Sequence, residues 1–156
     1  MEILAAVTIL SIISVTLIGY FLTAMNKSTE QNKRIIAANL ARQKAAEIRD
    51  TYRTDNTKYQ ALLNSFTPSN HTLKFDKNNG DQLVKLDEVD INGTSYKFEV
   101  GVDNNNARRS EMAGVTAVAE RVDNYMLNMR ISVYWGEAAS EEAHKTSIES
   151  YIVKGW

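Results

Sequence analysis

The chain of 156 residues has no cysteine, a single proline and almost no excess of charge of either sign. The absence of cysteine excludes a disulfide scaffold, a thiolate nucleophile and any metal site built on cysteine ligands. The formal net charge of −1 excludes a broad basic surface for nucleic acid or anionic lipid. Because Pro68 is the only proline, no earlier residue obliges a helix to break.

Charge is also nearly absent from the first 25 residues, where Glu2 is the only charged side chain and 18 residues are hydrophobic. A helix of about 22 residues extends about 33 Å, enough to cross a bilayer core of about 30 Å. Residues 1–25 are therefore predicted to form a transmembrane helix. A cleaved signal peptide is the alternative, but the apolar stretch is too long for one and lacks a basic start and a clear cleavage site.

A second apolar pattern continues the helix beyond the uncharged segment. Apolar side chains recur at a spacing of four, with Lys44 interrupting them and alanines beside them, which is the stripe of an amphipathic helix. Residues 26–53 are predicted to extend the first helix to about 50 residues, so that half of it needs a partner outside its own domain. The residues predicted to pack this half on a sheet are Ile36, Leu40, Ile48 and Tyr52.

The pattern changes to that of strands in residues 54–156. Residues 54–57, 67–70 and 76–81 are expected to be turns or loops. Leu83–Ile91 and Thr94–Val102 are expected to form a hairpin around Asn92-Gly93, and residues 127–135 and 145–154 two further strands. Residues 112–122 are ambiguous. Because an antiparallel sheet must cover its apolar face, we predict an α+β fold in which the amphipathic helix lies on that sheet.

Chemical sites have little support in the sequence. His71 and His144 lie in polar stretches without the spacing of metal ligands, and residues 76–81 lack the closing glutamate of a calcium loop. Arg108 and Arg109 are read as a solvated loop tip in preference to a partner contact. No nucleophile, phosphate or dinucleotide motif is present. We expect neither enzymatic activity nor a cofactor.

The start of the chain, MEILAAVTIL at residues 1–10, resembles that of mature type IV pilins and pseudopilins, which open with a short apolar run, a glutamate and a hydrophobic helix. Residues 37–49, AANLARQKAAEIR, are similar to minor pilins of the PilV type and to minor pseudopilins of type II secretion. The resemblance implies a helix laid on a sheet and a structural role in secretion, DNA uptake, motility or adhesion. It also implies filament assembly through Glu2, Ile3, Leu4, Val7 and Leu10.

The same resemblance implies the partners and the location. The partners are other pilin subunits, the prepilin peptidase and the assembly platform, with membrane lipid before assembly; contact with nucleic acid stays open. In the family a basic leader ending in glycine is removed a few residues before the glutamate. Here only Met1 precedes Glu2, so we expect a start codon assigned too late. The basic residues Lys27, Lys33 and Arg34 would otherwise keep the domain in the cytoplasm, whereas a leader restores a domain outside the cytoplasmic membrane.

Two other classes of protein remain as alternatives. A single-pass membrane protein with a monomeric ligand-binding or sensory domain would share the anchor and the sheet, but would need neither Glu2 nor the uninterrupted helix. A secreted enzyme with a signal peptide would have its mature N-terminus near Lys27.

Overall fold

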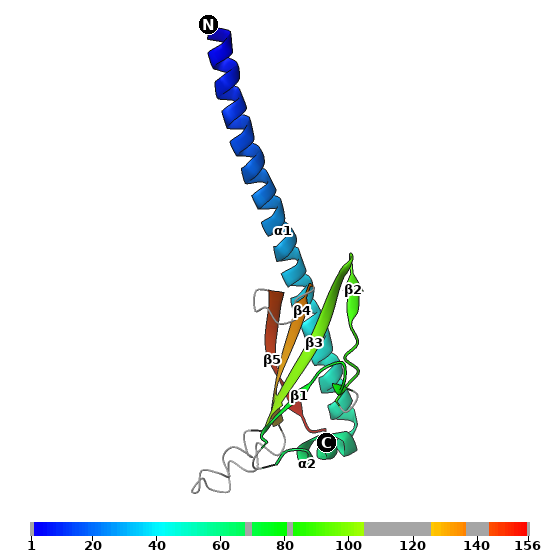
Figure 1. The fold of residues 1–156 in the computed structure, drawn as a ribbon. Coiled ribbons are helices and arrows are strands. Elements are labelled where there is room, and N and C mark those ends of the chain that lie inside the picture. Colours follow the sequence, from blue (N-terminus) through cyan, green and yellow to red (C-terminus); the bar gives the residue numbers. More distant parts are fainter. Residues whose placement is uncertain (1, 68–69, 81–82, 105–125, 137–143, 156) are drawn as a thin grey trace, which may run out of the picture. The chain divides into compact units, whose positions relative to one another are not determined.

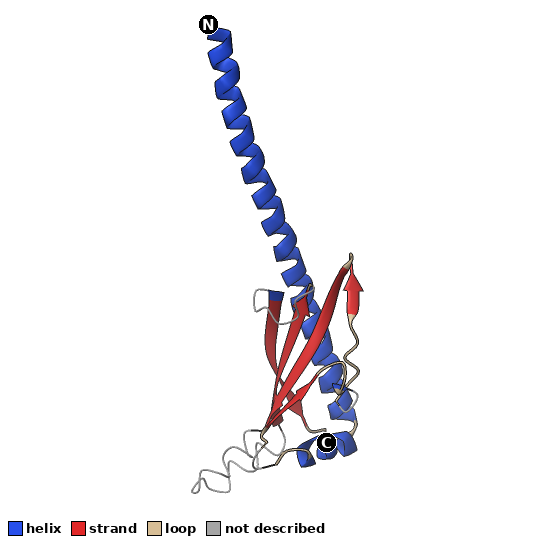
Figure 2. Cartoon of the chain, viewed as in Figure 1, coloured by secondary structure: helices blue, strands red, loops and turns tan. Residues whose placement is uncertain are grey.

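The computed structural model describes residues 2–67, 70–80, 83–104, 126–136 and 144–155. Contacts divide the chain into two compact units, residues 1–35 and residues 36–156, and each is described by itself. The described residues of the first unit are helical throughout (Figure 2). The elements in chain order are helices α1 (Glu2–Thr54) and α2 (Asn56–Asn64) and strands β1 (Thr72–Phe75), β2 (Val89–Ile91), β3 (Thr94–Asp103), β4 (Met126–Trp135) and β5 (Lys145–Val153) (Figure 1).

The second unit is built on one antiparallel sheet with the order β1-β3-β4-β5. Strand β2 also pairs with β3, so that both short strands line the same side of it: β1 along residues 100–103 and β2 along residues 94–96. The long strands β3 and β4 pair over eight residues in register, from Tyr96 opposite Trp135 to Asp103 opposite Asn128. The α+β class predicted from the sequence is confirmed: the C-terminal half of α1 packs on this small sheet.

The core lies between α1 and the inner face of the sheet. Alternate residues of β3 and β4 are buried, as their period of two requires. From α1, the side chains of Ile48 and Tyr52 are fully buried, whereas Ile36 and Leu40 are only partly buried at the edge of the core. The helix also contributes small side chains to the core; the buried alanines are Ala37, Ala41 and Ala45.

Helix α2 was not expected, and the prediction of a turn over residues 54–57 was wrong. Only Asp55 lies outside the two helices, and its carboxylate accepts hydrogen bonds from the backbone N–H groups of Thr57 and Lys58 at 3.0 and 3.2 Å. This N-cap satisfies donors that an uncapped helix would leave unpaired. Tyr59 and Leu62, three residues apart, then point into the core.

The hairpin around Asn92-Gly93 is present, but its first arm is shorter than predicted. Both turn residues have positive φ, 52° and 72°, which is why this pair suits the turn. The arm is β2 alone, because Leu83 and Leu86 are both buried at a spacing of three, which a strand with alternating faces does not give. The sequence prediction also missed β1, a strand of four residues in which Phe75 is the one buried residue. Residues 112–122 lie outside the described residues.

Candidate functional site

The most unusual surface of the described residues is the N-terminal part of α1. Its large apolar side chains are exposed along the whole of residues 3–25, and a window of 18 residues has a mean hydropathy of 2.3 with none of it buried. Soluble monomers rarely expose a continuous apolar surface of this extent. By length and composition, α1 can cross a membrane. The residues predicted from the sequence for assembly are exposed here: Ile3 by 82%, Leu4 by 78%, Val7 by 58% and Leu10 by 65%.

The serine and threonine hydroxyls on this part of α1 donate hydrogen bonds within the helix. The hydroxyl of Thr8 donates to the carbonyl of Leu4 at 2.7 Å, and that of Ser14 donates to Leu10 at 2.8 Å. Such internal bonds spare the helix the cost of an unpaired polar group in an apolar medium. The same pattern, a bond to a carbonyl three or four residues earlier, holds for Ser11, Thr16, Thr23 and Thr29. The helix therefore offers mainly apolar contact area, and the hydroxyl protons at these positions are already donated to its own carbonyls.

Glu2 is the first residue of α1, and its side chain is not among those the structure describes. Its backbone position nevertheless places it one residue before the exposed apolar stretch that begins at Ile3. The five residues predicted for assembly thus all lie in the first three turns of α1.

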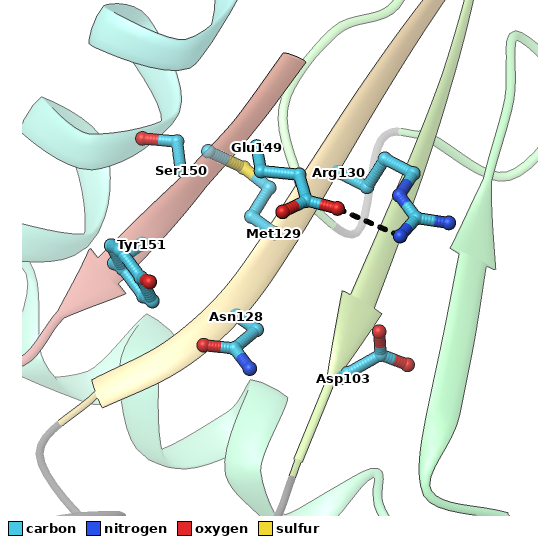
Figure 3. A pocket seen from close by; sticks show the side chains of 7 residues that line it. All are labelled: Asp103, Asn128, Met129, Arg130, Glu149, Ser150 and Tyr151. Carbon is cyan, nitrogen blue, oxygen red and sulfur yellow. Dashed lines mark hydrogen bonds and ion pairs between the residues drawn. The ribbon is translucent and has the colours of Figure 1, made fainter. Parts of the chain in front are cut away.

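A polar hollow of about 130 Å³ lies over the ends of β3, β4 and β5 (Figure 3). Arg130 and Glu149 face each other across β4 and β5, with 2.7 Å between Nη2 and Oε1. The hydrogen bond and the charge of Glu149 raise the pKa of the Arg130 guanidinium, and Asp103 adds to the effect. The carboxylate of Asp103 accepts a hydrogen bond from the hydroxyl of Thr72. The guanidinium of Arg130 thus lies among two carboxylates, so the hollow carries one cation and two anions.

The other polar candidates are spread over the sheet and are not brought together. His144 lies against Trp135, with ring centroids 6.1 Å apart, while the carbonyl of His71 accepts a hydrogen bond from the backbone of Asn104. In the loop after β1, the carboxylate of Asp76 accepts from the backbone N–H of Asn78 at 2.8 Å, so it acts as a turn cap. Within the described residues no three histidine or acidic side chains are grouped to hold a metal ion. Arg108 and Arg109 lie outside the described residues.

No family model, no curated protein and no solved structure matches the chain. The two features of the chain that bear on its function are the exposed apolar surface of α1 and the sheet that carries the C-terminal half of this helix.

Proposed function

We propose that the protein is a structural subunit of a type IV pilus or pseudopilus, held in the cytoplasmic membrane through α1 before assembly. The observation that carries the proposal is the fully exposed apolar surface of residues 3–25 on a helix that runs without interruption to Thr54. A membrane anchor alone needs only the first part of such a helix. A filament subunit needs the apolar part to pack against its neighbours and the amphipathic part to hold the domain.

The proposed mechanism is an exchange of one apolar environment for another. In the bilayer the side chains of residues 3–25 are surrounded by lipid, and in the filament they are surrounded by the same part of neighbouring subunits. Helix association in an apolar medium depends on close packing, and the small residues Ser11, Ser14 and Gly19 allow it. Because the serine and threonine hydroxyls donate to carbonyls of their own helix, the transfer leaves none of these donors unpaired. No catalytic residue is required.

Glu2 would make this exchange selective. A carboxylate at the apolar end of a helix is tolerated at the membrane interface, but inside a bundle of helices it needs a cation. By analogy with the family, that cation is the N-terminal amine of an adjacent subunit. Removing one partner of a buried ion pair costs about 3–5 kcal/mol, enough to stop incorporation.

The finer assignments rest on the resemblance of residues 1–10 and 37–49 to the family. They are a minor subunit, processing by a prepilin peptidase, transfer by an assembly platform, and a domain outside the cytoplasm. Translating the bases upstream of Met1 tests them together. We expect an in-frame basic leader, then a glycine, then about three residues before Met1, and an in-frame stop codon there would contradict the family assignment.

Replacing Glu2 tests the selective step directly. We expect Glu2→Val to remain in the membrane fraction and to disappear from the sheared filament fraction, both measured by immunoblot. Glu2→Asp keeps the charge and serves as the control, with most of the incorporation retained. Undiminished copurification of the Glu2→Val protein with the other filament subunits would contradict the proposed role of the carboxylate.

A photoreactive residue on α1 separates the filament subunit from a solitary membrane-anchored domain. With benzoylphenylalanine at Leu10, we expect cross-linking to another chain that itself begins with an apolar helix, identified by mass spectrometry. The same residue at Thr57, exposed on α2, is the control for non-specific capture. Cross-links from Leu10 to lipid alone would favour the solitary membrane protein.

A further inference from the structure

Strand β5 is one edge of the sheet. It pairs with β4 over nine residues, from Lys145 to Val153, and among the described residues no strand pairs with its other side. An edge of this length presents a row of backbone N–H and C=O groups that another extended chain can pair with. Short strands and inward-pointing charged side chains commonly protect such an edge from pairing with another chain. On β5, by contrast, the residues that face the core are the apolar Ile148 and Ile152.

A groove of about 360 Å³ opens beside the C-terminal end of this edge. One side of the groove is formed by exposed residues of α1, and the opposite side is formed by Val153 of β5, which is 47% exposed. The residues that line it are Ala46, Arg49, Asp50, Arg53 and Val153. The small side chain of Ala46 leaves space in the groove for a side chain of a partner. The aliphatic side chain of Val153 offers an apolar contact beside the charged groups.

The charge of the groove is mainly positive. Arg49 and Arg53 are four residues apart on α1 and therefore project on the same side of it. Both are exposed, and within the part of the chain that the structure describes no carboxylate forms an ion pair with either guanidinium. Asp50 is the one acidic residue in the lining, so two cations face the groove against one anion.

We propose that this groove binds an extended acidic segment of another protein chain, which adds as a further strand to β5 and places carboxylates on Arg49 and Arg53. Strand addition draws its affinity from main-chain hydrogen bonds and its specificity from alternate side chains. A paired strand lies about 4.8 Å from its neighbour, so it would occupy the space between β5 and the two arginines. Arginine is suited to such a contact because its planar guanidinium can bind a carboxylate through two hydrogen bonds.

The inference does not rest on filament assembly, because every residue of the groove belongs to residues 36–156. Failure of the experiments on Glu2 would leave it untouched, and its own failure would leave the role of residues 3–25 untouched.

The direct test uses the full-length protein in detergent micelles and fluorescent nine-residue peptides. One peptide alternates valine or threonine with glutamate, and its counterpart has lysine in place of glutamate. We expect the acidic peptide to bind at least tenfold more tightly by fluorescence anisotropy. Hydrogen exchange should show new protection of the β5 amides. Equal affinities, or protection confined to other elements, would overturn the proposal.

Charge reversal then assigns the binding to the two arginines. We expect the double variant Arg49→Glu with Arg53→Glu to bind the acidic peptide at least tenfold more weakly and to bind the basic peptide more tightly than the acidic one. Arg42→Glu, at another exposed arginine of α1, is the matched control and should leave the preference unchanged. Circular dichroism checks that the variants fold. Unchanged peptide binding by the double variant, or binding of phosphatidylserine vesicles without binding of either peptide, would overturn the assignment to an acidic chain segment.

Discussion

Gly155 lies against the main-chain carbonyl of Arg53, so close that a Cβ atom at position 155 would overlap the carbonyl oxygen. The chain leaving β5 therefore returns to the last turn of α1, and the absence of a side chain is what permits the contact. This contact joins the last described residue of the chain to the helix that carries the core alanines.

Replacing Gly155 with alanine is expected to destabilise the domain. The backbone of Arg53 is fixed by its helix and cannot move aside, so we expect a loss of about 1–3 kcal/mol, as for other overpacked sites. Gly101→Ala is the control, because a Cβ there would meet nothing closer than the carbonyl oxygen of Arg130 at 4.0 Å. The melting temperatures of both variants and of the parent protein are measured by thermal unfolding, followed by tryptophan fluorescence. Equal melting temperatures would show that the C-terminal segment can move away without cost.

Lys44 interrupts the apolar stripe of α1, and the structure gives the reason. Its Nζ lies 5.6 Å from the centroid of the Phe98 ring and donates to the carbonyl of Lys85 at 3.0 Å and to Glu47 at 2.7 Å. The side chain is only 17% exposed. The lysine thus covers the edge of the core and ties the segment before β2 to the helix.

We expect Lys44→Ala to lower the free energy of unfolding by about 2 kcal/mol, since it removes a hydrogen bond from a charged donor and a cation–π contact. Lys44→Met keeps the aliphatic stem and should lose about half as much. The control is Lys85→Ala, whose side chain is 73% exposed in an ion pair with Asp87. A surface pair of this kind contributes less than about 1 kcal/mol. A Lys44→Ala loss no larger than that of Lys85→Ala would contradict the role given to Lys44.

The elements that the sequence predicted well are those in which one period persists over many residues. The alternation of Tyr96 to Val102 and of Leu127 to Trp135 specified β3 and β4, and the spacing from Ile36 to Tyr52 specified the amphipathic half of α1. The sequence prediction placed the alanines beside the larger residues, and both sets satisfy the helical period. In the structure these alanines are buried, whereas Ile36 and Leu40 beside them are only partly buried.

The missed features depend on single residues or on tertiary contacts. Helix α2 depends on one N-cap, Asp55, in a polar stretch that reads equally well as a turn. Arg49 is an exposed charged residue outside the apolar stripe of α1. Arg49 lines the same groove as Val153, which lies more than a hundred residues later in the chain. This neighbourhood arises only because β5 packs beside α1. No local pattern carries that information.

Two buried tyrosines predict a loss of stability in alkali. Tyr52 and Tyr59 are fully buried, and desolvation raises the pKa of each from 10.0 to about 12. Between these values the unfolded chain has lost the phenolic protons that the folded chain keeps, so the free energy of unfolding falls as the pH rises. Each tyrosine contributes a slope of at most about 1.4 kcal/mol per pH unit, and below pH 10 neither contributes one.

Tyr59→Phe separates the two contributions. Among the described residues the Tyr59 hydroxyl has no hydrogen-bond partner, so removing it should leave the stability at pH 7 unchanged or raise it by up to about 1 kcal/mol. Between pH 10 and 12 we expect the variant to lose about half the slope attributed to the pair. Denaturant titrations at several pH values measure the free energy of unfolding and its slope with pH. Tyr151→Phe, at an exposed ring, is the control for removing a hydroxyl, and a variant as alkali-sensitive as the parent would contradict the assignment.

The apolar surface of α1 predicts where a charge is tolerated. A lysine at the centre of a membrane helix costs about 3 kcal/mol, so Ile12→Lys with Ile13→Lys should cost about 6 kcal/mol. Both side chains are exposed, by 62% and 49%, so neither substitution disturbs packing within the chain. We expect carbonate extraction to release the double variant and to leave the parent protein in the membrane. Ser28→Lys, which lies beyond the uncharged segment, is the control, and we expect it to stay in the membrane during carbonate extraction like the parent protein. Carbonate resistance of the double variant would mean that residues 3–25 are not what holds the protein in the membrane.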